Sequence, residues 1–292
     1  MRKEMMSDSI SFRLLQRLKA GVASMTDASR ALVSEFVRSQ QVEHSAAFMG
    51  KNGQPDLYYT SFGWLLSYVL GIPLPASERK AFLEEHPSAN GDLIHEAALV
   101  RCQLLHRLMM RGGRLLALLP HAAPALLPLS SYSVPQNDAL CPYTQFVWLS
   151  LLEDAGCSLP KAEKVLKALD DYRTEDGGYA NVKAAKTATL NATAAALAVR
   201  GRLTGWRNDT DLEALRRLQD TMGGFRASAL APIPDLLSTA MALFVLRSYH
   251  VRPLYDTSAF VEAHWLEQGG FSATLLDDDS DVEYVFYGLL AL

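Results

Sequence analysis

Acidic side chains gather near the C-terminal end of the chain, at Asp277, Asp278, Asp279, Asp281 and Glu283. Adjacent carboxylates at the start of a helix commonly cap its free N–H groups and favour its positive end. A carboxyl group that stays protonated in a dry site can instead act as a catalytic acid. The spacing alone leaves both interpretations open.

Two lysines precede a predicted helix in the segment GGYANVKAAKTATLN. Lys183 and Lys186 stand six and three residues ahead of Thr189, where the helix is expected to begin. Amines beside a helix N-terminus suit a phosphate group, because the helix dipole and the positive charges act in the same direction. We therefore predict a diphosphate-binding role for both lysines, with an ordinary surface loop as the alternative.

The cysteines and histidines give little sign of a metal site. His95, Cys102 and His106 share one helical stripe, but residues 7 and 11 positions apart are about 10 and 16 Å apart along a helix axis. They cannot share one ion. With Cys141 and Cys157 the chain has three cysteines and no CxxC spacing, which favours a reducing compartment over a disulfide framework.

Composition places the chain among ordinary globular proteins. It has 292 residues, 49% hydrophobic and 21% charged, enough to bury a large core. A net charge of -4 argues against a nucleic-acid partner. The N-terminus lacks the apolar run of a signal peptide, and prolines interrupt the most apolar stretch, 115–129. We expect one cytoplasmic domain over residues 1–292 and no transmembrane segment.

A repeat organises the second half of the chain. A Gly-Gly pair precedes an aromatic residue at Tyr179, Phe225 and Phe271, each 46 residues after the one before. Ten residues after each aromatic, a polar residue opens an apolar helical run. The opening residues, and the residues one helical turn later, are Thr189 with Thr193, Asp235 with Thr239, and Asp281 with Val285. A weaker copy contains Phe48, Asp56 and Thr60.

Six helix openings follow from this frame, near residues 56, 92, 140, 189, 235 and 281, with further helices within 1–40. Between the openings lie second helices with a 3.6-residue apolar period, for example LPKAEKVLKALDDY and DTDLEALRRLQDT. Alternating strand patterns are nearly absent from the sequence. The predicted class is all-α, built from helix pairs that can extend as a solenoid or close on themselves.

The segments GGFRASALAPIPDLLSTAMALFVL and GKNGQPDLYYTSFGWLLSYVLG resemble repeats of the protein prenyltransferase β subunits and of the squalene and terpene cyclases. The resemblance is strong over residues 40–71 and 172–292. It implies an α6/α6 toroid, in which six inner helices surround an apolar cavity. It also implies that the inner-helix N-termini and the Gly-rich loops meet at one mouth.

The functional residues of these families carry over only in part. Prenyltransferase zinc is held by an Asp, a Cys two residues later and a His on another inner helix; Asp235 matches, but Leu237 and Tyr284 stand at the other positions. The cyclase DxDD motif keeps only its first Asp in Asp235-Leu236-Leu237-Ser238. We therefore expect no zinc. Asp235, Asp279 and Asp281 are the candidate catalytic acids or Mg²⁺-diphosphate ligands.

Aromatic and polar residues on the predicted inner helices are candidates to line the cavity. They are Tyr58, Tyr59, Trp64, Tyr143, Trp148, Asn191, Phe244 and Tyr284. In an open cavity they would hold an isoprenoid or other apolar molecule; in a filled one they are core. Three hypotheses stay open: an isoprenoid-handling transferase or cyclase, a non-catalytic toroid that serves as a binding or assembly subunit, and a glycosidase-like barrel with two carboxylates across a cleft.

Overall fold

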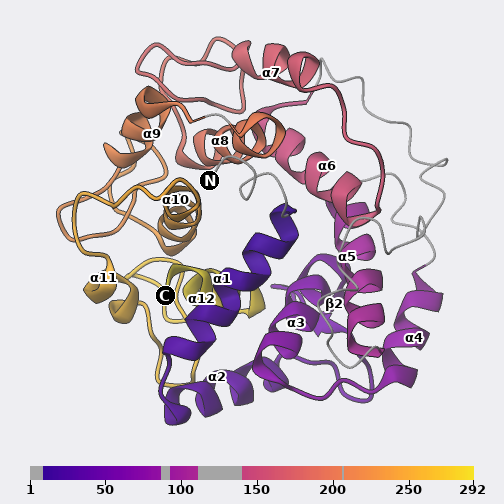
Figure 1. Cartoon of the computed structure of the whole chain (residues 1–292). Helices are drawn as coiled ribbons and strands as arrows, with labels where there is room; N and C mark the ends of the chain where they lie inside the picture. The colour runs from indigo at the N-terminus through magenta and orange to yellow at the C-terminus, as the bar shows by residue number, and fades with distance from the viewer. Residues whose placement is uncertain (1–8, 87–92, 111–139, 206) are drawn as a thin grey trace.

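The computed structural model describes residues 9–86, 93–110, 140–205 and 207–292 (Figure 1). The described part is predominantly helical, which confirms the all-α class; its only named strands are β1 (Phe48–Met49) and β2 (Pro55–Asp56). The helices are α1 (Ile10–Ser24), α2 (Asp27–Ser39), α3 (Leu57–Leu70), α4 (Ala76–Glu85), α5 (Leu93–Met110), α6 (Pro142–Asp154), α7 (Ala162–Asp170), α8 (Leu190–Thr204), α9 (Asp209–Arg216), α10 (Leu236–Ser248), α11 (Ser258–Ala263) and α12 (Val282–Ala291).

Helices α3, α5, α6, α8, α10 and α12 contact one another in that order, and α12 also contacts α3; we call these six the ring helices. Figure 1 shows these helices around a common centre, with α4, α7, α9 and α11 farther out. Helices α3, α8, α10 and α12 each begin one residue after a predicted opening, and α6 begins two residues after. The opening predicted near residue 92 and the apolar stretch 115–129 lie outside the described residues.

The repeat frame has a hydrogen-bonding cause. The threonine one turn into a helix accepts a hydrogen bond from the N–H of the aromatic residue in the preceding loop. This bond joins Phe48 to Thr60 at 2.9 Å, Tyr179 to Thr193 at 3.0 Å and Phe225 to Thr239 at 2.9 Å. In the last repeat Val285 replaces the threonine, and Ser280 Oγ accepts the Phe271 N–H instead, at 3.0 Å. The loops are therefore fixed to the helices that they precede.

Helix α1 lies across the C-terminal ends of several ring helices (Figure 1). The Ile10 N–H donates to Glu153 Oε2 at 2.9 Å, and Ser11 Oγ donates to Asp154 Oδ2 at 2.8 Å, both at the end of α6. Lys19 Nζ reaches the Tyr68 hydroxyl at the end of α3, at 3.4 Å. Helix α1 therefore contacts the C-terminal ends of α6 and α3, whereas the Gly-rich loops precede helix starts.

Gly21 makes the closest approach of α1 to the ring. A Cβ atom on Gly21 would lie 2.0 Å from the carbonyl oxygen of Leu289 in α12, closer than any real Cβ contact. We expect Gly21→Ala to lower the free energy of unfolding by about 2 kcal/mol, because α1 must shift away from backbone atoms. In a helix without that contact the same change would raise stability by about 1 kcal/mol. The sign of the change in the free energy of unfolding, measured by urea denaturation, therefore tests whether α1 packs against α12. Ala20→Ser is the control, because Ala20 lies on the exposed face of α1.

One cluster of buried hydrophobic residues extends along the described chain from Ile10 to Ala291, and a smaller one lies between α5 and α6. Among the helices that the structure describes, none combines the length and the hydrophobicity that spanning a bilayer requires.

Candidate functional site

Two of the three predicted catalytic acids, Asp235 and Asp281, lie at the starts of helices and act as caps, as Asp56 does at the start of α3. Asp281 Oδ1 accepts the Tyr284 N–H at 3.0 Å, and Asp56 does the same for Tyr59 at 3.0 Å. Asp235 accepts the Ser238 N–H with one oxygen and the Ser238 hydroxyl with the other, both at 2.7 Å. Each carboxylate thus satisfies N–H groups that a helix start leaves unpaired.

Burial raises the pKa of Asp235 and of Asp281 above its usual value. The two Ser238 hydrogen bonds and the charge of His264 oppose this rise at Asp235. At Asp281 the capping hydrogen bond and Lys51 oppose it. Both groups are therefore partly desolvated acids, and both already have a structural role.

A cleft of about 440 Å³ opens beside the start of α12, between the β1–β2 hairpin and the loop before α12. Its lining includes Asp277, Asp279, Asp281, Tyr284 and Lys51. Asp279 is exposed there, and the Lys51 ammonium lies over the Tyr284 ring, 5.5 Å from its centroid. Two of the three predicted acids, Asp279 and Asp281, thus meet at one opening, with a lysine that the sequence interpretation did not single out.

A second carboxylate centre lies where α3 meets α12. The Tyr58 hydroxyl on α3 donates to Glu283 Oε1 at 2.7 Å, and the Tyr287 hydroxyl lies 3.5 Å from the same oxygen. Tyr143, at the start of α6, interacts electrostatically with Tyr58, Tyr287 and Glu283. We call these four residues the Glu283–tyrosine centre. All four are half-buried, so each keeps accessible surface.

Burial is the main cause of the shifted acidities in this centre. It raises the pKa of Glu283, and the nearby Asp281 charge adds to the rise. Hydrogen bonds from Tyr58 and Tyr287 and the charge of Lys51 oppose it. Burial and the Glu283 charge likewise raise the pKa of Tyr58 and Tyr287, so both hydroxyls stay protonated donors. The arrangement can hold a carboxyl group that gains or loses a proton beside aromatic rings.

The two predicted diphosphate-binding lysines lie on an exposed loop. The Lys183 ammonium pairs with Asp171 at 2.9 Å and lies over the Tyr172 ring, 5.4 Å from its centroid. Lys186 is exposed, four residues before the first residue of α8. The loop borders the ring, since Asn181 Oδ1 accepts the Tyr143 N–H at 3.1 Å. A phosphate group would have to compete with Asp171 for Lys183.

The other residues predicted to line an apolar cavity lie in different parts of the structure. Tyr59 and Tyr284 are half-buried near the cleft, and burial raises the pKa of Tyr284 to about 12. Trp64 is fully buried; its Nε1–H donates to the Ala46 carbonyl at 2.7 Å, and its ring packs near Phe82 of α4. These contacts of Trp64 are with the outer layer.

Trp148 and Phe244 are buried in the helix packing, and Asn191 is half-buried. Trp148 belongs to the small hydrophobic cluster between α5 and α6. Phe244 borders a very small cavity under α1, with Ile10 among its neighbours. Asn191, near the start of α8, is half-buried, and its Oδ1 atom is enclosed without a hydrogen-bond partner among the described residues.

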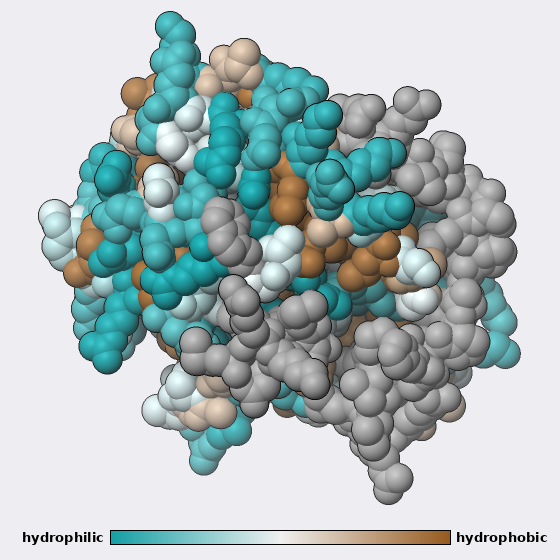
Figure 2. Space-filling model, turned by 45° about the horizontal axis from the view of Figure 1, so that its top comes forward, coloured by the Kyte–Doolittle hydropathy of each residue, from teal (hydrophilic) through white to brown (hydrophobic). Residues whose placement is uncertain are grey.

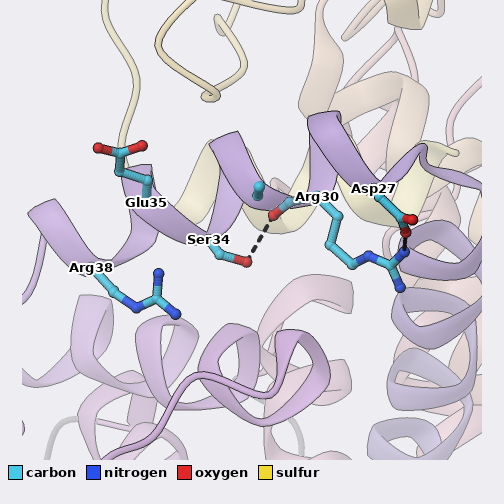
Figure 3. A pocket seen from close by; sticks show the side chains of 6 residues that line it. Asp27, Arg30, Ser34, Glu35 and Arg38 are labelled. Atoms are coloured by element: carbon cyan, nitrogen blue, oxygen red, sulfur yellow. Dashed lines mark hydrogen bonds and ion pairs between the residues drawn. The ribbon is translucent and has the colours of Figure 1, made fainter.

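A more open hollow of about 450 Å³ lies along α2 (Figure 3). Asp27 and Arg30 form an ion pair there, and Ser34 Oγ donates to the Arg30 carbonyl at 2.7 Å. Figure 3 shows Glu35 and Arg38 farther along the same helix. None of the predicted site residues lies in this hollow.

Within the described ranges, no group of three His, Cys, Asp or Glu side chains is placed to hold a metal ion. Comparison of the chain with protein-family models and with curated protein sequences finds no match.

The Glu283–tyrosine centre was not among the predicted catalytic residues, although its parts were visible in the sequence. Glu283 lies two residues after the opening Asp281, and Tyr287 lies one turn beyond Glu283 on the same helix face. That spacing could have singled out the pair. Its contact with Tyr58, 225 residues away in sequence, could not be derived from local spacing.

Proposed function

We propose that the chain forms an α6/α6 toroid that binds an isoprenoid or similar apolar small molecule in its interior, with Glu283 as the acid. The observation that carries the proposal is the Glu283–tyrosine centre, which joins a desolvated carboxyl group to aromatic side chains from α3, α6 and α12. The cyclic order of helix contacts supports the toroid.

This centre has the properties that alkene chemistry requires. A protonated carboxyl group can transfer its proton to an alkene carbon, and aromatic faces stabilise the carbocation that forms. Loss of a proton to the Glu283 carboxylate would complete an isomerisation or cyclisation. Lys183 and Lys186 remain the predicted contacts of a diphosphate head, and Mg²⁺ is the metal ion that such a head group would bring.

Exposed hydrophobic residues on the loops favour a second candidate, a non-catalytic subunit that binds another protein. Leu230 is 81% exposed and Leu276, at the matching place in the next repeat, is 83% exposed. Backbone hydrogen bonds from Leu190 to Ala227 and from Leu236 to Ala273 attach these loops to neighbouring helix starts. Apolar groups in such positions are typical of protein contacts. A subunit of this kind needs no ligand inside the ring.

Incubation with geranyl, farnesyl and geranylgeranyl diphosphate, with and without Mg²⁺, tests the proposal. Binding is followed by tryptophan fluorescence and products by gas chromatography with mass spectrometry. We expect Glu283→Gln to reduce turnover by about 10²-fold or more, because it removes the transferable proton, while substrate affinity changes little.

Glu163→Gln is the matched control. Glu163 also lies in the first turn of its helix, α7, but is exposed. It should retain wild-type turnover. Absence of both binding and turnover with every prenyl diphosphate would contradict the isoprenoid function and favour the subunit. Turnover that survives in Glu283→Gln would contradict the role of Glu283.

A further inference from the structure

We propose that the Glu283–tyrosine centre binds a positively charged organic group, of which a quaternary ammonium is the simplest example. The inference names a ligand class for the site proposed above. It shares that site but does not depend on isoprenoid turnover.

The first argument is the charge of Glu283. Its carboxylate accepts hydrogen bonds from two tyrosines, and no ion pair joins it to a cation among the described residues. Lys51 is the cation that acts on it electrostatically, but its ammonium lies over the Tyr284 ring. Burial raises the pKa of this carboxyl group, so a bound cation would favour its ionised form and offset the cost of burying that charge.

The second argument is the set of tyrosines. Tyr58, Tyr143 and Tyr287 come from α3, α6 and α12, and all three keep accessible surface. Aromatic rings attract cations through their negative faces, most strongly where water is displaced. The position of Lys51 over Tyr284 shows that a cation already faces a ring at this end of α12.

The third argument selects an organic cation over a metal ion. A divalent metal ion held by side chains alone requires several oxygen or nitrogen ligands, and the described residues contain no group of three His, Cys, Asp or Glu side chains that could supply them. A quaternary ammonium needs no hydrogen-bond acceptor, and its surface is apolar. It can therefore lie against the faces of tyrosine rings while its charge compensates one carboxylate.

Choline and its neutral carbon isostere, 3,3-dimethylbutan-1-ol, test the inference by isothermal titration calorimetry on the full chain. We expect choline to bind at least about tenfold more tightly than the isostere, because shape is matched and charge is not. Glu283→Gln should weaken that preference, because only the attraction of the rings remains, and the exposed control Glu163→Gln should retain it in full. Tyr58→Phe keeps the ring but removes its hydrogen bond to Glu283, so it should retain part of the preference.

Circular dichroism of each variant establishes that it is folded before titration. Equal affinity for the two probes in the wild-type protein, or an unchanged preference in folded Glu283→Gln, would overturn the inference. If Glu283→Gln does not fold, a weaker preference in wild-type protein brought to acidic pH, with the fold intact, supports the inference, and an unchanged preference overturns it. Choline binding without prenyl diphosphate binding would support the cation site while contradicting the isoprenoid function, so the two can fail separately.

Discussion

Replacing Asp211 with alanine is expected to lower the free energy of unfolding by about 3 kcal/mol. The Asp211 side chain is fully buried and accepts two hydrogen bonds from Arg173, at 2.9 and 3.0 Å. It also accepts from Asn208 at 2.9 Å and from the Tyr179 hydroxyl at 3.3 Å. Removing the carboxylate leaves all these donors unsatisfied, although Arg173 is exposed enough to regain some water.

Urea denaturation followed by circular dichroism measures this change. Asp209→Ala is the matched control, because Asp209 lies two residues away in the same helix and forms an exposed ion pair with Arg207. Surface pairs contribute little, so the control should cost about 1 kcal/mol or less. Equal losses in the two variants would show that Asp211 does not hold α9 to the 173–179 segment.

Replacing Asp154 with asparagine is expected to stabilise the protein above pH 6. Burial raises the pKa of Asp154 to about 6 from its usual value of 3.8, while Arg101 and the Ser11 hydroxyl oppose the rise. The folded state therefore holds this proton more strongly than the unfolded chain does. Stability from the group is fully present below about pH 4 and is lost as pH rises towards 6.

The loss above pH 6 amounts to about 3 kcal/mol, at about 1.4 kcal/mol for each unit of pKa shift. Asparagine stays neutral at every pH and can still accept the Ser11 hydrogen bond. Unfolding by urea at pH 4 and at pH 7.5 should therefore show a gain at the higher pH only. The exposed Asp278→Asn should show no such difference. A gain of the same size at both pH values would contradict the assigned cause.

The distribution of polar and apolar residues on the surface is that of a chain which buries most of its hydrophobic residues. In the view of Figure 2, hydrophilic residues cover much of the described surface, and hydrophobic residues appear between them in small areas. The exposed leucines of the Gly-rich loops depart from this pattern, which is why they bear on the subunit alternative.

Local features made the ring-helix starts predictable. Asp235 and Asp281 cap their own helices through N–H groups three residues later, and Thr193 and Thr239 bind loop N–H groups. These contacts recur at a fixed spacing, so the sequence displays them as a repeat. Asp235 and Asp281 were predicted to be catalytic acids although they are helix caps, because a cap and a catalytic acid use the same residue type.

Capping and apolar periodicity act within a few residues, so the amino-acid sequence is enough to predict the helical class and the places where ring helices begin. The contacts of Glu283 with Tyr58, of Lys183 with Asp171 and of α1 with α12 join distant parts of the chain and became visible with the folded structure. The Glu283 contact exists because the last helix packs against α3. A side chain's burial and partners depend on such distant contacts, and these set the acidity from which the site's chemistry follows.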